Sequence, residues 1–344
     1  MNRIGRRGFL KLSSASFAAL ALPSPRAAVG SVSFPDGERL GRVTEAHVEV
    51  FSRPTPDSKV LGEKEFDDVL LVYRDIIGKG IYPRNHVWFE TPEGFIWSAY
   101  AQPVRNQPND LLLSIPEEGI WTEVTVPYVD GLWKPDSLSD TRYRLYYSMV
   151  LNVEARELGP EGGTWYRVRD ENGVVMYAPG ESFRLIRPEE LDPISPEIEN
   201  KSIVVNLSRQ DLSVRESGVE VYYCRISSGY SYYPRDGILR WYTPIGQMWI
   251  WRKMVSRHFS GGDAVTGFDL PGTGWTMLFH GGGAALHSTY WHNDFGTPRS
   301  AGCINMRPAD AKWVFRWSLP RVEYRPGDIT VQWPNPGTRV IVEA

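Results

Sequence analysis

Short apolar runs separated by turn residues make up most of the hydrophobic pattern, beginning at about residue 31. Their length and their content of Val, Ile, Tyr and Trp favour β-strands over helices. The clearest predicted strands cover residues 87–90, 95–97, 164–168, 174–177, 202–207, 212–215 and 339–342. Residues 308–317 give the one clear helical pattern, with apolar side chains at Ala311, Val314 and Phe315. The pattern therefore predicts a mainly β protein with a minor helix.

The part of the chain before residue 191 looks duplicated. In the first half, Trp88 begins an aromatic run that a Glu93-Gly94 turn connects to the next strand. In the second half, Trp165 takes the same place before an Asn172-Gly173 turn. Asn-Gly is a strong hairpin signal because both turn positions favour positive φ. Short strands at this spacing predict two small β-barrels.

These two barrels are module 1 (residues 31–110) and module 2 (residues 111–190). The segment Gly41-Arg42-Val43 and the aromatic hairpins resemble bacterial SH3-like modules, which implies either cell-wall binding or a structural spacer. A Pro-rich segment, residues 187–196, follows and is predicted to be extended, because proline disfavours both helix and sheet. We therefore place the last domain at residues 198–344 and refer to it as the C-terminal domain.

The N-terminus indicates export. Arg6-Arg7 begins a twin-arginine pattern, an apolar stretch covers residues 12–22, and small residues follow at Ala27-Ala28. This pattern predicts a twin-arginine signal peptide at residues 1–28 and a location in the cell envelope. The apolar stretch is too short for a stable membrane span. A membrane anchor or a disordered basic tail is the alternative.

Charge and cysteine content narrow the class of protein. The 38 basic and 41 acidic residues give a net charge of −3, so bulk charge gives no attraction to nucleic acid. Two cysteines in an exported protein allow one disulfide. Cys224 lies in an apolar, β-prone run, whereas Cys303 lies in a Gly- and Ser-rich segment beside histidines. We therefore favour a buried structural thiol at Cys224 and a reactive thiol at Cys303, with the disulfide as the alternative.

Residues with reactive side chains are concentrated in the segment 280–303, which holds three of the six histidines and Cys303. A thiol is a weak nucleophile until it ionises, and a neighbouring imidazole can take its proton. Gly302 directly before the cysteine permits a close approach of the backbone, and a turn of this kind can direct N–H groups at a developing oxyanion. These residues together predict a Cys–His acyl-transfer site.

Residues 286–306 resemble the signature of L,D-transpeptidase catalytic domains, in which a His is followed later by Ser-His-Gly-Cys-hydrophobic-Arg/Asn. The matching residues are His287, Ser300, Gly302, Cys303, Ile304 and Asn305, with the cysteine 16 positions after the His. Residues 242–246 resemble the Thr-Pro-x-Gly turn of the family, and residues 201–205 its first strand. The resemblance covers residues 201–344 and implies a β-sandwich-type domain that acts on peptidoglycan stem peptides.

The resemblance also implies roles. Cys303 attacks a stem-peptide carbonyl, His287 carries the proton, and the backbone of Ser288 orients the imidazole. The N–H groups of Gly302 and Cys303 form the oxyanion hole. The residues expected to line or support the substrate groove are Tyr290, Trp291, His292, Ser300 and Asn305. The implied reaction is 3→3 cross-linking with release of a terminal D-alanine, without cofactor or metal, and carbapenems are expected to acylate the cysteine.

One position departs from the family pattern. Ala301 stands where a His is usual. We expect an active enzyme in which His292 supplies the missing donor, the alternative being a weakened or inactive one. A zinc site of His280, His287, His292 and Cys303 is disfavoured, because their spacing matches no common zinc motif. An L,D-carboxypeptidase using the same site and a non-catalytic wall-binding protein remain alternatives.

Overall fold

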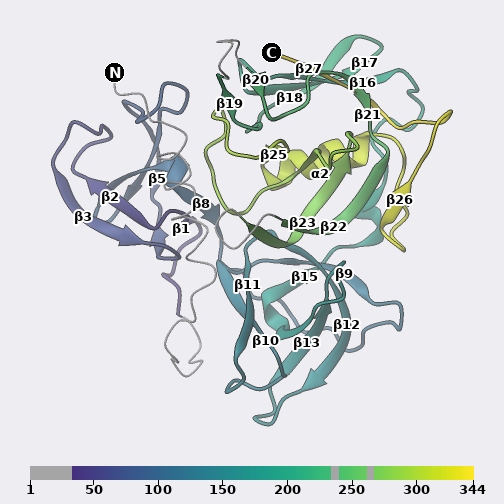
Figure 1. The fold of residues 1–344 in the computed structure, drawn as a ribbon. Coiled ribbons are helices and arrows are strands. Elements are labelled where there is room, and N and C mark those ends of the chain that lie inside the picture. Colours follow the sequence, from purple (N-terminus) through teal and green to yellow (C-terminus); the bar gives the residue numbers. More distant parts are fainter. Residues whose placement is uncertain (1–32, 234–239, 262–266) are drawn as a thin grey trace.

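The computed structural model describes residues 33–233, 240–261 and 267–344 and is mainly β, as predicted (Figure 1). The predicted signal peptide, residues 1–28, lies outside the described residues. Within the described residues, no helix has the length and apolar character needed to cross a membrane. The strands gather into the three parts of the chain that the sequence pattern separates.

Module 1 consists of two small sheets around a Trp-rich core. Its strands are β1 (Leu40–Val43), β2 (His47–Phe51), β3 (Val60–Glu65), β4 (Val69–Leu71), β5 (Arg74–Ile77), β6 (Val87–Thr91), β7 (Gly94–Trp97) and β8 (Ala101–Val104). The strand orders are β4-β1-β8 and β3-β2-β7-β6-β5. The predicted aromatic hairpin forms β6 and β7, in which Trp88 and Trp97 pair across the strands. Both tryptophans are fully buried, so they belong to the core of the module.

Module 2 forms a single seven-stranded sheet of order β11-β10-β14-β13-β12-β9-β15. Its strands are β9 (Ile120–Val124), β10 (Tyr128–Leu132), β11 (Thr141–Tyr146), β12 (Val150–Leu158), β13 (Thr164–Arg169), β14 (Val175–Pro179) and β15 (Phe183–Leu185). The predicted hairpin connects β13 and β14, but only Gly173 of the Asn172-Gly173 pair has positive φ, at 78°. The backbone N–H of Gly173 donates to the carbonyl of Asp170 at 3.1 Å, and this bond closes the turn. The expectation of positive φ at Asn172 is therefore wrong, and the SH3-like assignment of both modules stays a prediction.

The Pro-rich segment between module 2 and the C-terminal domain is not extended throughout. Pro188–Leu191 forms a 3₁₀ turn. The carboxylate of Glu190 accepts a hydrogen bond from the backbone N–H of Arg187 at 2.9 Å, which caps the start of this turn. The prediction of uninterrupted extended backbone is wrong here, because a local capping contact outweighs the preference of the flanking prolines.

The C-terminal domain has two five-stranded sheets, of order β18-β17-β16-β27-β21 and β25-β24-β23-β22-β26. The strands of the first are β16 (Lys201–Asn206), β17 (Asp211–Glu216), β18 (Val219–Arg225), β21 (Gly246–Trp249) and β27 (Arg339–Glu343). Those of the second are β22 (Arg252–Gly261), β23 (Phe268–Leu278), β24 (Ala285–Ser288), β25 (Ile304–Met306) and β26 (Asp328–Thr330). A short pair, β19 (Ser231–Tyr232) and β20 (Arg240–Trp241), lies apart from both sheets. The inner faces of the two sheets supply most of one apolar core.

Helix α2 (Pro308–Trp317) has the bounds that the sequence predicts. Proline suits the first helical position, where its missing N–H is not needed. The predicted apolar side chains Ala311, Val314 and Phe315 are buried, and the helix packs on β23 and β24. The helix therefore covers the face of these strands that points into the core.

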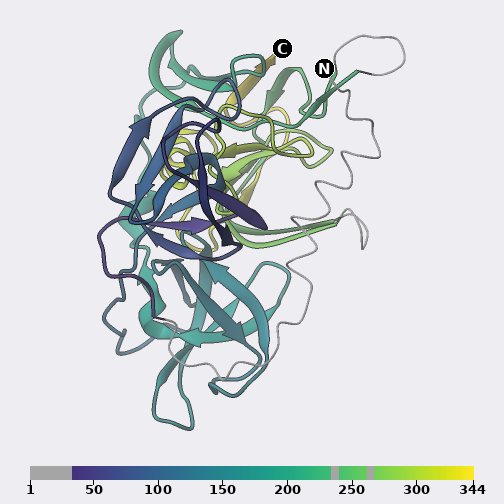
Figure 2. The ribbon, with the colours of Figure 1, turned by 90° about the vertical axis from the view of Figure 1, so that its left-hand side faces the viewer.

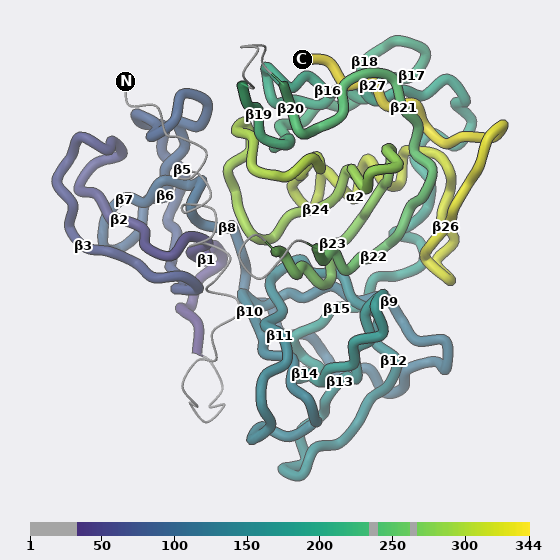
Figure 3. The backbone as a smooth tube through the Cα atoms, in the orientation of Figure 1, coloured from purple at the N-terminus to yellow at the C-terminus, as the bar shows by residue number. Residues whose placement is uncertain are grey.

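Both modules contact the C-terminal domain. Trp121 of β9 packs against the C-terminal core and donates its indole N–H to the carbonyl of Tyr324 at 2.9 Å. Strand β12 lies against β22 and β23, and Figure 3 shows module 2 beneath this hairpin. In Figure 2 module 1 lies in front of the C-terminal domain, with module 2 below. The three parts therefore form a continuous packed unit around the second sheet.

Candidate active site

A parallel strand pair brings the predicted nucleophile and base together. Strands β24 and β25 run parallel in a register that pairs His287 with Asn305. Cys303 directly precedes β25 and thus lies beside Ala285 at the start of β24. Alternate residues of a strand share a face, so Cys303 and His287 point to the same side of the sheet. Strand rise and spacing place their Cα atoms about 8 Å apart. A thiol and an imidazole that face each other across this distance can approach hydrogen-bonding range.

His287 is held as one neutral tautomer. Its side chain is 3% exposed, and Nδ1 lies 2.8 Å from the carbonyl oxygen of Ser288. Because a carbonyl can only accept, Nδ1 carries the proton and Nε2 has a free lone pair. Burial lowers the pKa of this imidazole to about 4, which the Ser288 carbonyl partly opposes. At neutral pH the His287 ring is therefore uncharged, and its Nε2 can accept a proton.

Cys303 is half-buried among apolar side chains of the second sheet. It packs with Met254, Leu278 and Ala285, and its Sγ lies 3.9 Å from the carbonyl oxygen of Gly283. Burial raises the pKa of the thiol, although a backbone contact with Ala285 and the charge of Arg257 oppose this. The resting pair is therefore a thiol and a neutral imidazole, so proton transfer must accompany attack on a substrate.

The two cysteines differ in burial. Both are free thiols, so the disulfide alternative is wrong. Cys224 on β18 is 5% exposed, and burial raises its pKa strongly. A thiol buried in this way stays protonated and unreactive.

Ser300 stabilises the turn that contains Cys303. Its hydroxyl accepts a hydrogen bond from the N–H of Gly302 at 3.1 Å and donates to the carbonyl of Cys303 at 2.6 Å. Gly302 has a φ of 147°, and a Cβ at this position would lie 3.2 Å from the carbonyl oxygen of Tyr242. The prediction that the Gly302 N–H forms part of the oxyanion hole is therefore wrong, because this N–H already donates to the hydroxyl of Ser300. The N–H of Cys303 remains the candidate donor.

Tyr290 is placed in an interface between domains rather than in a substrate groove. Its side chain is 3% exposed, and its hydroxyl donates to the carbonyl of Pro271 at 2.9 Å. The ring stacks on Tyr146 of module 2 with a centroid distance of 5.8 Å. The prediction of a groove residue is therefore wrong for Tyr290. Trp291 is only partly buried, and its ring lies 5.7 Å from that of His287, so it borders the candidate site.

His292 and Asn305 of β25 form a buried pair. They are 5% and 1% exposed, so neither lines a groove as expected. The backbone N–H of Asp294 lies 3.2 Å from Nδ1 of His292, which must then accept. Nδ2 of the Asn305 side-chain amide lies 2.9 Å from Nε2, so Asn305 occupies the second ring nitrogen. With both ring nitrogens engaged, His292 cannot serve as the replacement donor in this arrangement.

Side chains of module 1 contact the segment that connects β24 and β25. Arg42 of β1 donates from its guanidinium to the carbonyl of Tyr290 at 2.6 Å. The side-chain amide of Asn293 donates to the carbonyl of Ser98 at 3.0 Å. Arg299, near the end of the connection, lies 3.5 Å from the carboxylate of Glu45. The segment between β24 and β25 is thus fixed by side chains from outside the C-terminal domain.

Arg257 is a site residue that sequence reasoning missed. It lies on β22, and its charge lowers the pKa of both His287 and Cys303. No local motif marks it, because it is 30 residues before His287 and 46 before Cys303 in the chain. Only the pairing of β22, β23 and β24 places it near the thiol.

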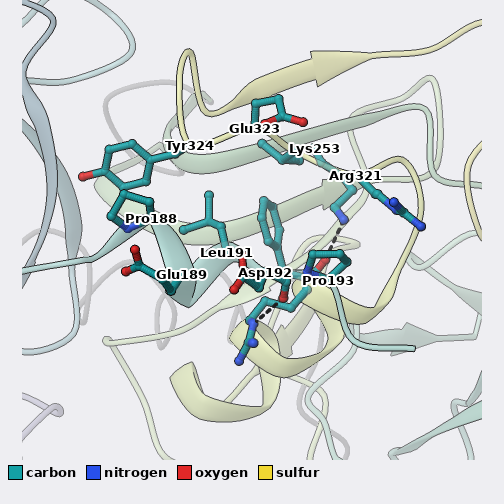
Figure 4. A pocket seen from close by; sticks show the side chains of 12 residues that line it. Pro188, Glu189, Leu191, Asp192, Pro193, Lys253, Arg321, Glu323 and Tyr324 are labelled. Atoms are coloured by element: carbon teal, nitrogen blue, oxygen red, sulfur yellow. Dashed lines mark hydrogen bonds between the residues drawn. The ribbon is translucent and has the colours of Figure 1, made fainter. Parts of the chain in front are cut away.

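A cavity of about 310 Å³ lies elsewhere on the domain, between the Pro188–Leu191 turn and the end of α2 (Figure 4). Lys253 borders it and donates its ammonium group to the carbonyls of Phe315 at 2.5 Å and Ser318 at 2.7 Å. A lysine that satisfies the last carbonyls of a helix stabilises the helix end. Neither Cys303 nor His287 lines this cavity, which supplies no part of the candidate site.

The histidines do not assemble as the zinc alternative requires. His280 is exposed and accepts the N–H of Gly282 at 3.0 Å. Both ring nitrogens of His292 are engaged as described above. Among the described residues, the one three-residue group with suitable ligand atoms is His47, Glu63 and Glu65, which is exposed on module 1.

Residues 200–342 match the model of the YkuD family, the L,D-transpeptidase catalytic domain. This match covers less than half of the chain and falls within the C-terminal domain, where the sequence motifs also show the family resemblance. Among solved structures, the chain is similar to an Enterococcus faecium L,D-transpeptidase, with 24% identity over 43% of this chain and a TM-score of 0.32. It is also similar to an L,D-transpeptidase from Stackebrandtia nassauensis, with 20% identity over 44% of this chain and a TM-score of 0.29. The chain spans 51% of the first structure and 58% of the second. One from Mycobacterium smegmatis has 18% identity over 54% of this chain and 78% of its own length, with a TM-score of 0.33. No curated protein sequence matches the chain.

Proposed function

We propose that this protein is an exported peptidoglycan L,D-transpeptidase that forms 3→3 cross-links through a thioester on Cys303. The observation that supports this most directly is the shared face of Cys303 and His287 on the parallel pair β24–β25. The unprotonated Nε2 of His287 supports it further, since a general base needs a free lone pair. The envelope location rests on the twin-arginine pattern at Arg6-Arg7.

In the proposed acylation step, Sγ of Cys303 attacks the stem-peptide carbonyl that precedes the terminal D-alanine. The thiol proton passes to Nε2 of His287, and a sulfur–carbon bond forms. The oxyanion receives the N–H of Cys303, which lies in the turn fixed by Ser300. The carbon–nitrogen bond then breaks, and His287 returns the proton to the leaving amine, so that D-alanine departs and a thioester remains.

In the second step, the side-chain amine of a neighbouring stem attacks the thioester. His287 takes the proton of the attacking amine, and the sulfur departs and is reprotonated. If water attacks instead, the product is a shortened stem with a free carboxylate, which is L,D-carboxypeptidase activity. Cys303 and His287 perform the same steps in both reactions.

Covalent labelling by a carbapenem tests the acyl-enzyme. Ertapenem is a suitable reagent, since the catalytic domain of an E. faecium L,D-transpeptidase has been solved acylated by it. The intact protein is expected to gain the mass of one ertapenem, and the adduct is expected to map to Cys303. Cys224→Ala is the matched control and should label as fully as the unmodified protein. Labelling that persists in Cys303→Ala would refute the thioester.

Product analysis then separates the two reactions. Incubation with disaccharide-tetrapeptide muropeptides is expected to give 3→3 dimers together with free D-alanine. Tripeptide stems without dimers would assign the protein as a carboxypeptidase. Wall binding without labelling or turnover would identify a non-catalytic wall protein.

A further inference from the structure

Arg257 lies against the side chains that surround the nucleophile. Its guanidinium sits 4.8 Å from the centre of the Phe259 ring, and one nitrogen lies 3.8 Å from the sulfur of Met254. Met254 and Phe259 both belong to the cluster that packs with Cys303. The Phe259 ring is in turn 5.0 Å from the ring of His287. The guanidinium therefore contacts side chains that in turn pack beside Cys303 and His287.

Most of the hydrogen-bonding capacity of this guanidinium is unused. An arginine has five N–H donors, and the thioether of Met254 is only a weak acceptor. Nε of Arg257 is buried without any partner. Within the described part of the chain, no carboxylate lies within ion-pair distance of it. Arg252, on the same strand, shows the contrast, because it pairs with Asp328 at 2.6 Å.

The pairing of β22 with β23 is irregular beside Arg257. Its register shifts between Arg257 and Phe259, where two steps along β22 oppose three steps along β23, from Thr273 to Leu270. His258 points to module 2, where its Nδ1 lies 2.5 Å from Asp170. Alternate residues of a strand share a face, so Arg257 and Phe259 lie on the side opposite His258. Bulges are over-represented next to active sites.

A cation with vacant donors beside a nucleophile is suited to an anionic ligand. A partly buried charge without a counter-ion is costly, and a carboxylate that meets the guanidinium fork removes this cost. The planar fork matches a carboxylate better than a lysine ammonium does. An acyl donor that ends in D-alanine carries a carboxylate on the Cα atom next to the scissile amide nitrogen, which is close to the sulfur during attack.

We propose that Arg257 binds the terminal carboxylate of the acyl donor beside Cys303 and so selects donors with a free C-terminus. This inference rests on the proposed function for the identity of the donor. The carboxylate site itself rests only on the geometry of Arg257. The two parts can therefore be tested separately.

Two alkylating reagents test the site without any peptide. Iodoacetate and iodoacetamide form the same sulfur–carbon bond with Cys303 and release iodide, but only iodoacetate carries a carboxylate. The rate ratio of iodoacetate to iodoacetamide cancels any change in the pKa of the thiol. Arg257→Gln is expected to lower this ratio about tenfold, the effect of one charge at close range in a partly screened site. Arg257→Lys should lower it less, because the charge remains but the fork is lost.

Arg252→Gln is the matched control. It removes the same charge from the same strand and is expected to leave the ratio unchanged. Labelling is measured on the Cys303 peptide by mass spectrometry. For the unmodified protein, added salt should slow iodoacetate and leave iodoacetamide unaffected, which requires no variant to fold. An Arg257→Gln ratio equal to that of the unmodified protein, or a salt-independent iodoacetate rate, would overturn the proposal.

A peptide experiment then tests the donor. A tetrapeptide stem with a free C-terminus should have a KM about tenfold lower than its C-terminal amide, and this preference should vanish in Arg257→Gln. If the reagent ratio responds to Arg257 but neither peptide acylates Cys303, the carboxylate site stands and the proposed function fails. If both peptides are used equally while the reagent ratio is unaffected, the proposed function stands and this inference fails.

Discussion

Replacing Arg42 with Met is expected to weaken the protein at the junction of its three parts. Arg42 is 1% exposed and belongs to module 1. Its guanidinium pairs with Asp67 at 2.7 Å and donates to the carbonyl of Tyr290 at 2.6 Å. It also lies 4.0 Å from the centre of the Tyr146 ring in module 2. One side chain thus connects both modules to the loop that follows His287.

The expected loss in the free energy of unfolding follows from the groups that lose their partner in Arg42→Met. Breaking a buried ion pair costs about 3–5 kcal/mol when the remaining charge is uncompensated. Asp67 keeps Arg144 at 3.0 Å, so the low end of this range applies. The buried carbonyl of Tyr290 loses its donor, which costs roughly 1–3 kcal/mol. We therefore expect Arg42→Met to lower the free energy of unfolding by about 4 kcal/mol.

Chemical denaturation followed by tryptophan fluorescence measures this change. The control is Arg39→Met, since Arg39 pairs with Asp75 at 2.7 Å on the surface, with both side chains about half exposed. An exposed pair contributes about 0–1 kcal/mol, so the control should stay close to the unmodified protein. Arg42→Met should also slow labelling of Cys303 by ertapenem, because the loop after His287 loses its anchor. Equal stability of the Arg42→Met and Arg39→Met variants would refute the reasoning.

Three further predictions concern pH and the nucleophile turn. Burial alone would lower the pKa of His258, but hydrogen bonds to its two carboxylate neighbours outweigh this and raise it. Its stabilisation is therefore complete below the unfolded pKa of about 6.5 and is lost as pH rises through the higher folded pKa; Tm should fall over this range, and a pH-independent Tm difference from His258→Gln would contradict it. Because the resting pair is uncharged, no thiolate absorbance from Cys303 is expected at neutral pH, and a His287→Ala variant should look the same; a neutral-pH thiolate signal that vanishes in His287→Ala would disprove this. Gly302→Ala should lower kcat/KM about tenfold or more through strain of roughly 1–3 kcal/mol at its positive φ, with Tm little changed; full activity would show that the turn tolerates a side chain.

The sequence predicts those parts of the molecule that depend on local pattern. Helix α2 was predictable to the residue, because its apolar spacing and Pro308 at its start act within the same ten positions. The roles of Cys303 and His287 rest on motif spacing and local chemistry and stay predictions. The buried role of Trp88 and Trp165 follows from the hairpins that contain them. In each case, the forces that set the structure act between near neighbours in the chain.

The remaining site features depend on contacts between distant segments. Tyr290 belongs to an aromatic run that is typical of a groove, yet Tyr146 and Arg42 approach it from two other modules and bury it. Arg257 comes near Cys303 and His287 only when β22, β23 and β24 pair in the second sheet. From the sequence alone the Gly302 N–H is available as an oxyanion-hole donor, but in the structure it donates to the hydroxyl of Ser300. Hydrogen-bond partners of this kind cannot be assigned before the register is known.

The parallel pairing of β24 and β25 has a consequence for biosynthesis. Parallel neighbours cannot be joined by a tight turn, so the chain between Ser288 and Ile304 must travel away from the sheet and return. This segment packs against modules 1 and 2, which leave the ribosome before His287 does. Domains tend to fold in order of synthesis. The segment between β24 and β25 therefore packs on modules that are synthesised before it, and a defect in either module is expected to displace this segment rather than unfold the two sheets of the C-terminal domain.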